Sequence, residues 1–331
     1  MRSIQILLVF LLFTNAAGAL CQELVVYTSR KAHLIQPIFE RFTKETGTTI
    51  TFTTDKAPAL IAKLQAEGKR TPADILITVD AGDLWHAANK GLLAPISSSL
   101  LEEKIPSHLR DPGGRWYGFS LRARTIVYDS TKIKPSELSD YRDLALPKWR
   151  GKLCLRTAKK VYNQSLVAMM LHQYGEKETR RVVSGWVKNL GQGVFANDTS
   201  LIEAIEAGRC EVGIVNSYYL GRLLVKKAAK KTKIFWPSAQ QGGVHMNISG
   251  AAALAHAPHK KEAVRFLEWL ASNGAQTLFA NANLEFPVVK ESSVHSVYDS
   301  FGAYSASNMP LVKAGELQAS AIILMDQVGY K

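Results

Sequence analysis

Short apolar runs alternate with amphipathic stretches along the first third of the chain. Three of these runs have the length and composition of strands: 24–28, 48–53 and 73–78. The stretches that follow them carry apolar residues at helical spacing, which predicts helices at 36–46, 57–67 and 82–89. Repeated strand–helix units of this length predict a parallel sheet that is covered by helices.

The first helix has its own start and stop signals in the sequence. We expect Ser29 to cap it, because a serine hydroxyl accepts a hydrogen bond from a free N–H of the first turn. Pro37 lies inside the apolar stripe, so we expect the regular helix to begin late, near Gln36. Gly47 follows the stripe and is expected to end the helix.

A second series of strands and helices begins after Arg150. Strands are predicted at 152–156 and 210–215, and the apolar run 248–254 is expected to cross between two lobes. Asn163 is expected to cap a helix at 164–174, and Ser200 with Glu203 forms a capping box for a later helix. The remaining predicted helices lie at 182–190, 263–271 and 275–281. The pattern therefore predicts two α/β lobes, whose ligand would lie beyond the carboxyl ends of the strands.

The N-terminus has the features of a secretory signal. Arg2 precedes an apolar run at 4–13 that is too short to span a membrane comfortably, and 17–19 is a cleavage site of small residues. We expect a signal peptide at 1–19 and a mature protein in the periplasm. Lipid anchoring at Cys21 is the alternative, which Leu20 disfavours because a small residue is expected before a lipidated cysteine.

The chain is basic, with 41 Lys and Arg against 28 Asp and Glu and a formal net charge of +13. Such a balance favours anionic ligands, anionic surfaces or nucleic acid. Export from the cytoplasm argues against nucleic acid, and the basic residues are dispersed along the sequence. No later stretch has the length of a membrane helix, so we expect no stable insertion into a membrane.

Three cysteines are present, and two of them lie at the starts of predicted strands. Neighbouring strands could bring Cys154 and Cys210 together, and an oxidising compartment permits a bond between them. We expect a Cys154–Cys210 disulfide, and the alternative is two buried free thiols.

Two adjacent tyrosines, Tyr218 and Tyr219, lie where the strand ending near Asn216 gives way to a helix that is expected from Leu220 onward. Their phenol oxygens could reach one point at such a turn, and phenolate is a hard oxygen donor that suits a highly charged cation. The alternative is a pair of aromatic residues at the edge of a core. Tyr162 lies in another predicted strand-to-helix loop of the same lobe, which strengthens the case for a ferric-ion site.

Five stretches carry a resemblance to a known family, and they occur in the family's order: 26–30, 78–82, 122–128, 161–165 and 216–222. With them the chain resembles the periplasmic ferric-ion-binding proteins of bacterial ABC importers. The resemblance implies a two-lobed, type II periplasmic binding protein-like fold with a hinge between the lobes. It divides the chain into an N-terminal lobe (22–123 plus about 248–290) and a C-terminal lobe (124–247 plus about 291–331).

The resemblance implies that Tyr218 and Tyr219 bind Fe³⁺, with Tyr162 as the third tyrosine of one subgroup. It also implies that a carbonate or similar anion completes the coordination and is held by Arg30 and Arg124. Lys31, Ala32 and Val79 stand where other subgroups place a His, a Tyr and a Glu ligand, so none of the three is expected to bind the metal.

These observations favour an extracytoplasmic solute-binding protein that captures ferric iron and delivers it to the membrane permease of an ABC importer. We expect a monomer without enzymatic activity, because no acid–base or nucleophile constellation is visible in the sequence. One alternative is a protein of the same fold that binds an organic or inorganic anion without metal. An enzyme on a similar bilobal scaffold is the other alternative.

Overall fold

The computed structural model describes residues 23–331. The predicted signal peptide at 1–19 and the alternative lipid anchor at Cys21 therefore lie outside the described residues. Within residues 23–331, no helix combines the length and the apolar character that crossing a membrane requires.

The N-terminal lobe is built on three parallel strands, with β1 between β2 and β3. Their bounds are β1 (Glu23–Thr28), β2 (Thr49–Thr54) and β3 (Ile75–Thr78). The helices of this lobe are α1 (Ala32–Thr46), α2 (Ala57–Glu67), α3 (Ala81–Asn89), α4 (Ser99–Lys104), α8 (Lys260–Leu270) and α9 (Asn273–Asn283). The strand–helix units predicted for the first third of the chain are therefore present.

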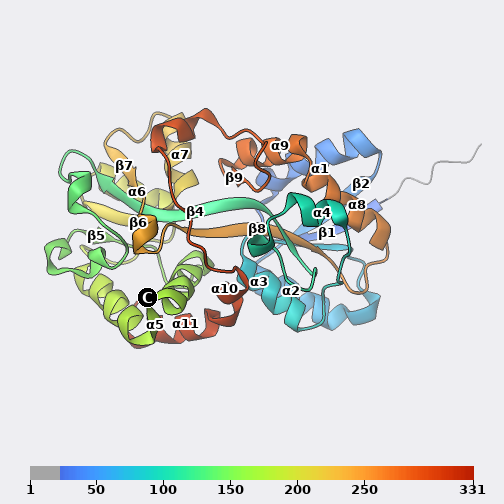
Figure 1. The fold of residues 1–331 in the computed structure, drawn as a ribbon, viewed down its shortest axis with the longest axis horizontal. Coiled ribbons are helices and arrows are strands. Elements are labelled where there is room, and N and C mark those ends of the chain that lie inside the picture. Colours follow the sequence, from blue (N-terminus) through green and yellow to red (C-terminus); the bar gives the residue numbers. More distant parts are fainter. Residues whose placement is uncertain (1–22) are drawn as a thin grey trace, which may run out of the picture.

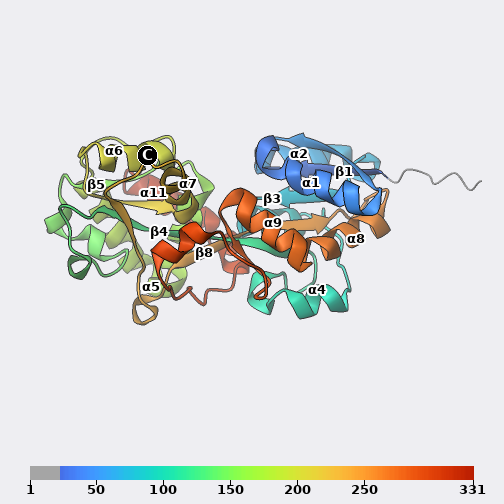
Figure 2. The same cartoon turned by 90° about the horizontal axis from the view of Figure 1, so that it is seen from above.

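Two long antiparallel strands, β4 (Tyr117–Asp129) and β8 (His245–Ala253), run from one lobe into the other (Figures 1 and 2). β8 pairs with β3 in the N-terminal lobe, and β4 pairs with β6 in the C-terminal lobe. The three strands of the first third pair in parallel, as predicted. The pairings of β8 with β3 and of β4 with β6 are antiparallel, so the complete sheet is mixed. The apolar run predicted to cross between the lobes belongs to β8.

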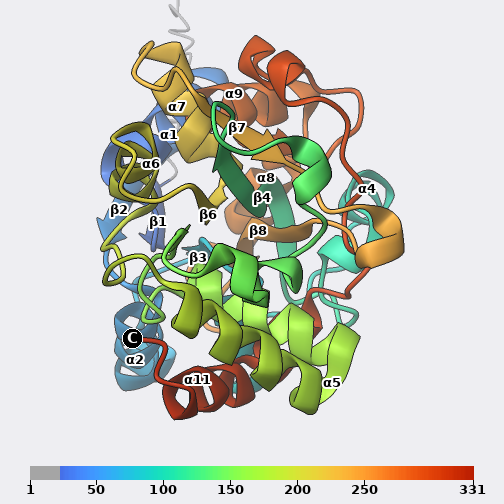
Figure 3. The same cartoon turned by 90° about the vertical axis from the view of Figure 1, so that its left-hand side faces the viewer.

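The C-terminal lobe contains the sheet order β4–β6–β5, with β7 also paired to β4. Its short strands are β5 (Leu153–Cys154), β6 (Val212–Asn216) and β7 (Thr232–Phe235), while β9 (Phe286–Pro287) pairs with β4 near the crossing. Its helices are α5 (Val161–Asn189), α6 (Asp198–Glu206), α7 (Ser217–Val225), α10 (Val312–Glu316) and α11 (Gln318–Gln327). α5 and α11 lie together below the sheet in Figure 3.

Three apolar cores support this arrangement. One joins β1 and β3 to α1 and α8 in the N-terminal lobe. The other two lie on opposite faces of the C-terminal sheet, because neighbouring residues of β4 point to opposite sides: Ile126 belongs to one core and Val127 to the other. The division of the lobes at 123/124, 247/248 and about 290/291 stays a proposal. Ile248 lies in the N-terminal core, whereas Ala123, Leu284 and Phe286 belong to a core of the C-terminal lobe.

Two helix starts differ from the sequence prediction because tertiary bonds take the capping side chains. α1 begins at Ala32 and not near Gln36, and Pro37 is accommodated inside it. Ser29 does not cap this helix, since its hydroxyl accepts a hydrogen bond from the backbone N–H of Val79 at 3.0 Å. Gly47 ends the helix with a left-handed φ of 76°, as predicted.

The C-terminal lobe shows the same effect. Asn163 lies inside the first turn of α5 and not before it, and its side-chain oxygen accepts a hydrogen bond from Arg124 at 2.9 Å. The two helices predicted at 164–174 and 182–190 are joined across Gly175, which has a non-helical φ of 74°. α6 is capped by Asn197, so the predicted capping box at Ser200 is wrong.

The predicted disulfide between Cys154 and Cys210 is present, with the two Cα atoms 6.0 Å apart. Cys154 ends β5 and Cys210 precedes β6, the strand that pairs with β5 in parallel. Both side chains are buried beside Leu201 and Ile205. The bond therefore links β5 to the segment that connects α6 with β6.

Removing the disulfide by Cys154→Ala together with Cys210→Ala should lower the free energy of unfolding. The bond closes a loop with a sequence separation of 56 residues, for which the chain-entropy relation gives about 4 kcal/mol. Urea unfolding of the oxidised wild type and of the double variant measures the difference. Dithiothreitol should destabilise the wild type and leave the variant unchanged, and equal stability of the two oxidised proteins would contradict a stabilising bond.

Candidate metal centre

The three predicted tyrosines lie in the first turns of two helices of the C-terminal lobe. Tyr162 is the second residue of α5, which follows β5. Tyr218 and Tyr219 are the second and third residues of α7, which begins directly after β6. The helix thus starts before the tyrosine pair and not at Leu220. Because β5 and β6 are parallel neighbours, the two helix starts meet at one edge of the sheet.

The structure brings the three phenol rings together. The hydroxyl oxygens of Tyr162 and Tyr218 are 3.4 Å apart. The rings of Tyr218 and Tyr219 have their centroids 4.4 Å apart and are tilted by 31°. Two oxygen ligands that bind one small cation at right angles lie roughly 3 Å apart, given metal–oxygen distances of about 2 Å. The Tyr162–Tyr218 separation is therefore close to what a shared metal ion requires.

Four basic side chains surround the phenols, and none of them was predicted to belong to the site. Arg122 and Lys160 lie 5.1 and 4.6 Å from the ring centre of Tyr162. Arg222 lies 4.8 Å from that of Tyr218. Arg156 lies between 5.6 and 5.9 Å from the rings of Tyr162 and Tyr219. One signal was available in the sequence, because Arg222 follows Tyr218 by one helical turn.

These charges act differently on the three phenols. Burial raises the pKa of Tyr162, but the nearby charges of Arg122 and Lys160 outweigh burial and leave it below the usual value. Burial and the two neighbouring phenols raise the pKa of Tyr218 well above its usual value. Burial likewise raises the pKa of Tyr219. Tyr162 is thus the phenol that ionises most readily, and the other two need a cation to stabilise their phenolates.

Arg124 lies beneath the tyrosines and joins the elements that carry them. Its guanidinium donates hydrogen bonds to Asn163 in α5, to Asn216 at the start of α7 and to Asp198 in α6. Arg124 is 1% exposed and Asp198 is fully buried, so the ion pair between them is shielded from water. The Arg124 guanidinium therefore binds the residues that hold the two helices. Within residues 23–331, it donates no hydrogen bond to a tyrosine.

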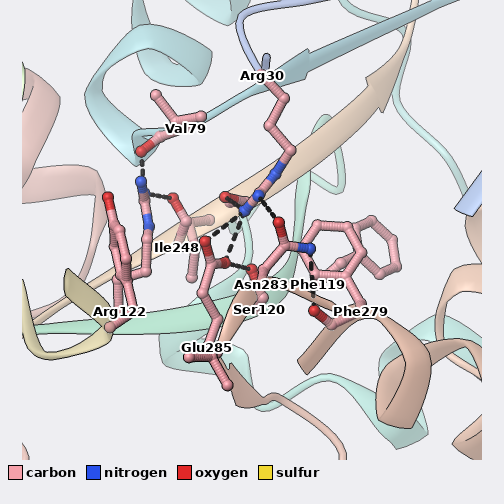
Figure 4. A network of polar contacts seen from close by, with 12 residues as sticks. Arg30, Val79, Phe119, Ser120, Arg122, Ile248, Phe279, Asn283 and Glu285 are labelled. Atoms are coloured by element: carbon pink, nitrogen blue, oxygen red, sulfur yellow. Dashed lines mark hydrogen bonds and ion pairs between the residues drawn. The ribbon is translucent and has the colours of Figure 1, made fainter. Parts of the chain in front are cut away.

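Arg30 lies in the N-terminal lobe, and its side chain binds residues of that lobe and of the hinge (Figure 4). It forms a 2.6 Å ion pair with Glu285 and donates to Asn283 at 2.8 Å and to Ser249 at 2.6 Å. Its terminal nitrogens are therefore occupied by protein oxygens. Its Nε is buried and has no partner among residues 23–331.

The positions that correspond to ligands in other subgroups do not supply one here. Val79 offers only its backbone oxygen, which accepts a hydrogen bond from Arg122 (Figure 4). Ala32 begins α1 and has no donor atom in its side chain, while Lys31 lines the space between the lobes. Within residues 23–331, no group of three or more His, Cys, Asp and Glu could hold a metal ion. A metal centre in the described part of the chain therefore depends on the phenols.

A large cleft lies next to the tyrosines without touching them, and a small cavity touches Tyr162. A cleft of about 990 Å³ between the lobes is lined by Lys160 and Val161, the residues before Tyr162, and by Arg30 and Lys31 of the opposite lobe. The tyrosines themselves do not line this cleft. A second cavity of about 10 Å³ touches Tyr162, and its lining includes His245. The Nδ1 atom of His245 is buried and has no partner among the described residues.

Comparisons with known proteins give a consistent result. A family model described as bacterial extracellular solute-binding protein matches residues 70–300. Iron uptake protein A1 of Synechocystis sp. is 38% identical over 316 residues, which cover 94% of this chain and 88% of that protein. The Fe(3+)-binding periplasmic protein of Serratia marcescens is 26% identical over 318 residues, which cover 94% of this chain and 88% of that protein.

A solved structure is also similar. The Trichodesmium protein IdiA (FutA), in complex with iron and citrate ligands, superposes with a TM-score of 0.88 at 41% sequence identity. The superposition covers 93% of this chain and 100% of the Trichodesmium chain. Both lobes and the segments between them are therefore shared with a protein whose structure was solved in complex with iron and citrate ligands.

The buried His245 should make the protein sensitive to acid. Burial and the charge of Arg124 lower the pKa of His245 to about 3, against about 6.5 in the unfolded chain. Below pH 6.5 the unfolded state therefore binds a proton that the folded state excludes. This residue should reduce the free energy of unfolding by about 1.4 kcal/mol per pH unit below about pH 6.5.

Urea unfolding at a series of pH values tests this expectation. His245→Gln should show a shallower loss of stability between about pH 6.5 and pH 5 than the wild type. His256→Gln is the matched control, because His256 is exposed, and its profile should follow that of the wild type. Parallel profiles for His245→Gln and the wild type would contradict the expectation.

Proposed function

The chain belongs to the bacterial extracellular solute-binding proteins, and from this membership we propose that it captures ferric iron and delivers it to an ABC importer. Fe³⁺ is the cargo, and the phenolates of Tyr162, Tyr218 and Tyr219 are its ligands. The membership confirms the two-lobed periplasmic binding fold and the expectation that the chain is not an enzyme. The names of the relatives, which include iron uptake and Fe(3+)-binding proteins, support the choice of metal.

The convergence of three phenols in one lobe carries this proposal. Tyr162 and Tyr218 have their oxygens 3.4 Å apart, and the ring of Tyr219 packs at a tilt against that of Tyr218. Three phenolates cancel the charge of Fe³⁺, and a trivalent cation stabilises phenolate strongly enough to displace the protons. A divalent cation would leave one negative charge in excess, so the site favours the ferric state.

Capture would proceed by closure of the lobes around a metal that first binds to the C-terminal lobe. All three phenols lie in that lobe, so the half-site exists before closure. The hinge consists of β4 and β8, and Arg122 on β4 already contacts the backbone oxygens of Val79 and Ile248 (Figure 4). The N-terminal lobe would then exclude water from the metal. Opening of the lobes by the transporter would release the iron.

A carbonate or similar anion would complete the coordination. Arg30 would face it through Nε, which has no partner among residues 23–331, since its terminal nitrogens are bound to Glu285, Asn283 and Ser249. Arg124 would act from below, by adding positive charge and by holding the first turns of α5 and α7. Arg156 also lies near the phenols, with Nη1 3.5 Å from the hydroxyl oxygen of Tyr219.

The proposed setting is the periplasm, reached by means of the signal peptide at 1–19. The Serratia relative is named a periplasmic protein, which supports this location. The partner would be the membrane permease of the importer, and we propose that the chain meets it as a monomer.

Phenolate-to-iron charge transfer tests the proposal directly. The apo protein incubated with a ferric chelate should develop a visible absorption band, because phenolate bound to Fe³⁺ absorbs visible light. Tyr162→Phe, Tyr218→Phe and Tyr219→Phe should each weaken the band and lower the affinity for iron by at least about ten-fold, since each removes a charged ligand.

The control is Tyr128→Phe, because Tyr128 is buried at the far end of β4, outside the site. Its band and affinity should equal those of the wild type. A wild-type protein that stays colourless and binds no iron would overturn the proposal, and it would favour the alternative of an anion-binding protein without metal.

A further inference from the structure

The start of α5 is bound directly to the N-terminal lobe, close to the first of the three tyrosines. Ser165 follows Tyr162 by about one helical turn. Its hydroxyl donates a hydrogen bond of 2.6 Å to the carboxylate of Asp80. Asp80 precedes α3 and caps it, because its side chain accepts the backbone N–H of Gly82 at 2.8 Å. Ser165 and Asp80 thus join the helix that carries Tyr162 to a helix of the opposite lobe.

A third side chain completes this contact from a strand that crosses between the lobes. The side-chain nitrogen of Asn247 on β8 donates hydrogen bonds of 2.9 Å to Asp80 and to Ser165. The side-chain oxygen of Asn247 accepts the backbone N–H of Ala81 at 3.0 Å. Asp80 is fully buried, and Ser165 is 1% exposed. Water therefore cannot readily replace these bonds while the lobes stay together.

The residue before Ser165 has a longer connection to the same helix of the N-terminal lobe. Gln164 accepts a hydrogen bond from Gln318 of α11 at 3.2 Å. The side-chain oxygen of Gln318 lies 2.7 Å from Nε2 of His86 in α3, and α10 packs against α3 as well (Figure 1). Two neighbouring residues of α5 are therefore connected to α3, one directly and one through the C-terminal helices.

The bond between Ser165 and Asp80 depends on how the lobes lie relative to each other. A movement that draws α3 away from α5 breaks this bond and leaves a carboxylate oxygen of Asp80 with one donor fewer. A buried polar group that loses its partner costs more free energy than the bond itself contributes. The contact therefore favours the arrangement in which the N-terminal lobe lies against the tyrosine-bearing helix.

On the premise of the proposed function, we infer that Asp80 and Ser165 are positioning residues for iron retention. Neither residue binds the metal. Their bond holds the N-terminal lobe against α5, one turn from Tyr162, and so slows the separation of the lobes that releases the iron. The length of time for which the iron stays bound thus depends on a contact outside the metal centre.

The main test is Ser165→Ala, which removes the hydroxyl and leaves the charges around the tyrosines unchanged. Iron-loaded protein is mixed with an excess of a competing chelator, and the decay of the visible band gives the rate of iron release. The variant should release iron about five-fold faster or more, because it lacks a buried hydrogen bond between the lobes. Its band should keep the wavelength of the wild type, since all three phenolates remain.

Asp80→Asn tests the same bond from the other lobe. Asparagine is similar in size and also caps helices, so α3 keeps its start. This variant should also release iron faster than the wild type. The double variant Asp80→Asn/Ser165→Ala should be no faster than the quicker single variant, because the two residues act through one bond. Effects that multiply in the double variant would contradict the pairing.

Thr179→Val is the matched control. Thr179 belongs to the same helix and is fully buried, but its hydroxyl has no partner among residues 23–331. Iron release from this variant should be as slow as from the wild type. If Thr179→Val accelerates release as much as Ser165→Ala does, the effect belongs to any buried hydroxyl of α5 and the inference is overturned.

The outcomes also distinguish this inference from the proposed function. A wild type that develops no band with ferric iron would overturn the proposed function, and the inference would fall with it. A wild type with the band, whose release rate Ser165→Ala leaves unchanged, would overturn the inference alone. A missing or shifted band in Ser165→Ala would mean that the hydroxyl supports the metal centre itself, which also contradicts the inference.

Discussion

The balance of charge between three phenol oxygens and the cations around them is the constraint on which the site depends. Burial keeps Tyr218 and Tyr219 protonated, because a phenolate in a low-dielectric interior is costly without a partner. Tyr162 differs, since Arg122 and Lys160 lie close to its ring and lower its pKa. Tyr162 is therefore the phenol that loses its proton most easily, and a trivalent cation would supply the charge that the phenolates of Tyr218 and Tyr219 need.

The two lobes contribute to this balance in different ways. In the C-terminal lobe, Arg124 binds Asn163, Asp198 and Asn216, so that one buried guanidinium fixes the first turns of both tyrosine-bearing helices. In the N-terminal lobe, Arg30 is fixed by Glu285 at the hinge, and its Nε has no partner in the described part of the chain. The C-terminal lobe thus holds the tyrosines in place before a ligand binds. The N-terminal lobe covers them and supplies positive charge.

Much of this arrangement could be predicted from sequence because it is encoded locally. The strand–helix order of the first third, the end of α1 at Gly47 and the Cys154–Cys210 bond follow from short patterns and strand adjacency. The errors arose where a long-range bond took a side chain that also suits a local role, as Val79 did with Ser29 and Arg124 with Asn163. The strand β4 and the antiparallel direction of β8 were also missed, because apolar runs do not encode strand direction.

The side chains around the tyrosines could not be predicted from local patterns, because they come from distant parts of the sequence. Glu285 lies 255 positions from Arg30 in the sequence, so nothing near Arg30 indicated that its terminal nitrogens are occupied. The placing of Arg122 and Arg156 beside the phenols depends on how β4 and β5 meet α5 and α7.

The measurement that tests the account most directly is a crystal structure of the iron-loaded protein with anomalous data at the iron absorption edge. We expect one anomalous peak within bonding distance of the oxygens of Tyr162, Tyr218 and Tyr219; an iron peak elsewhere, or phenol rings without metal between them, would contradict the account.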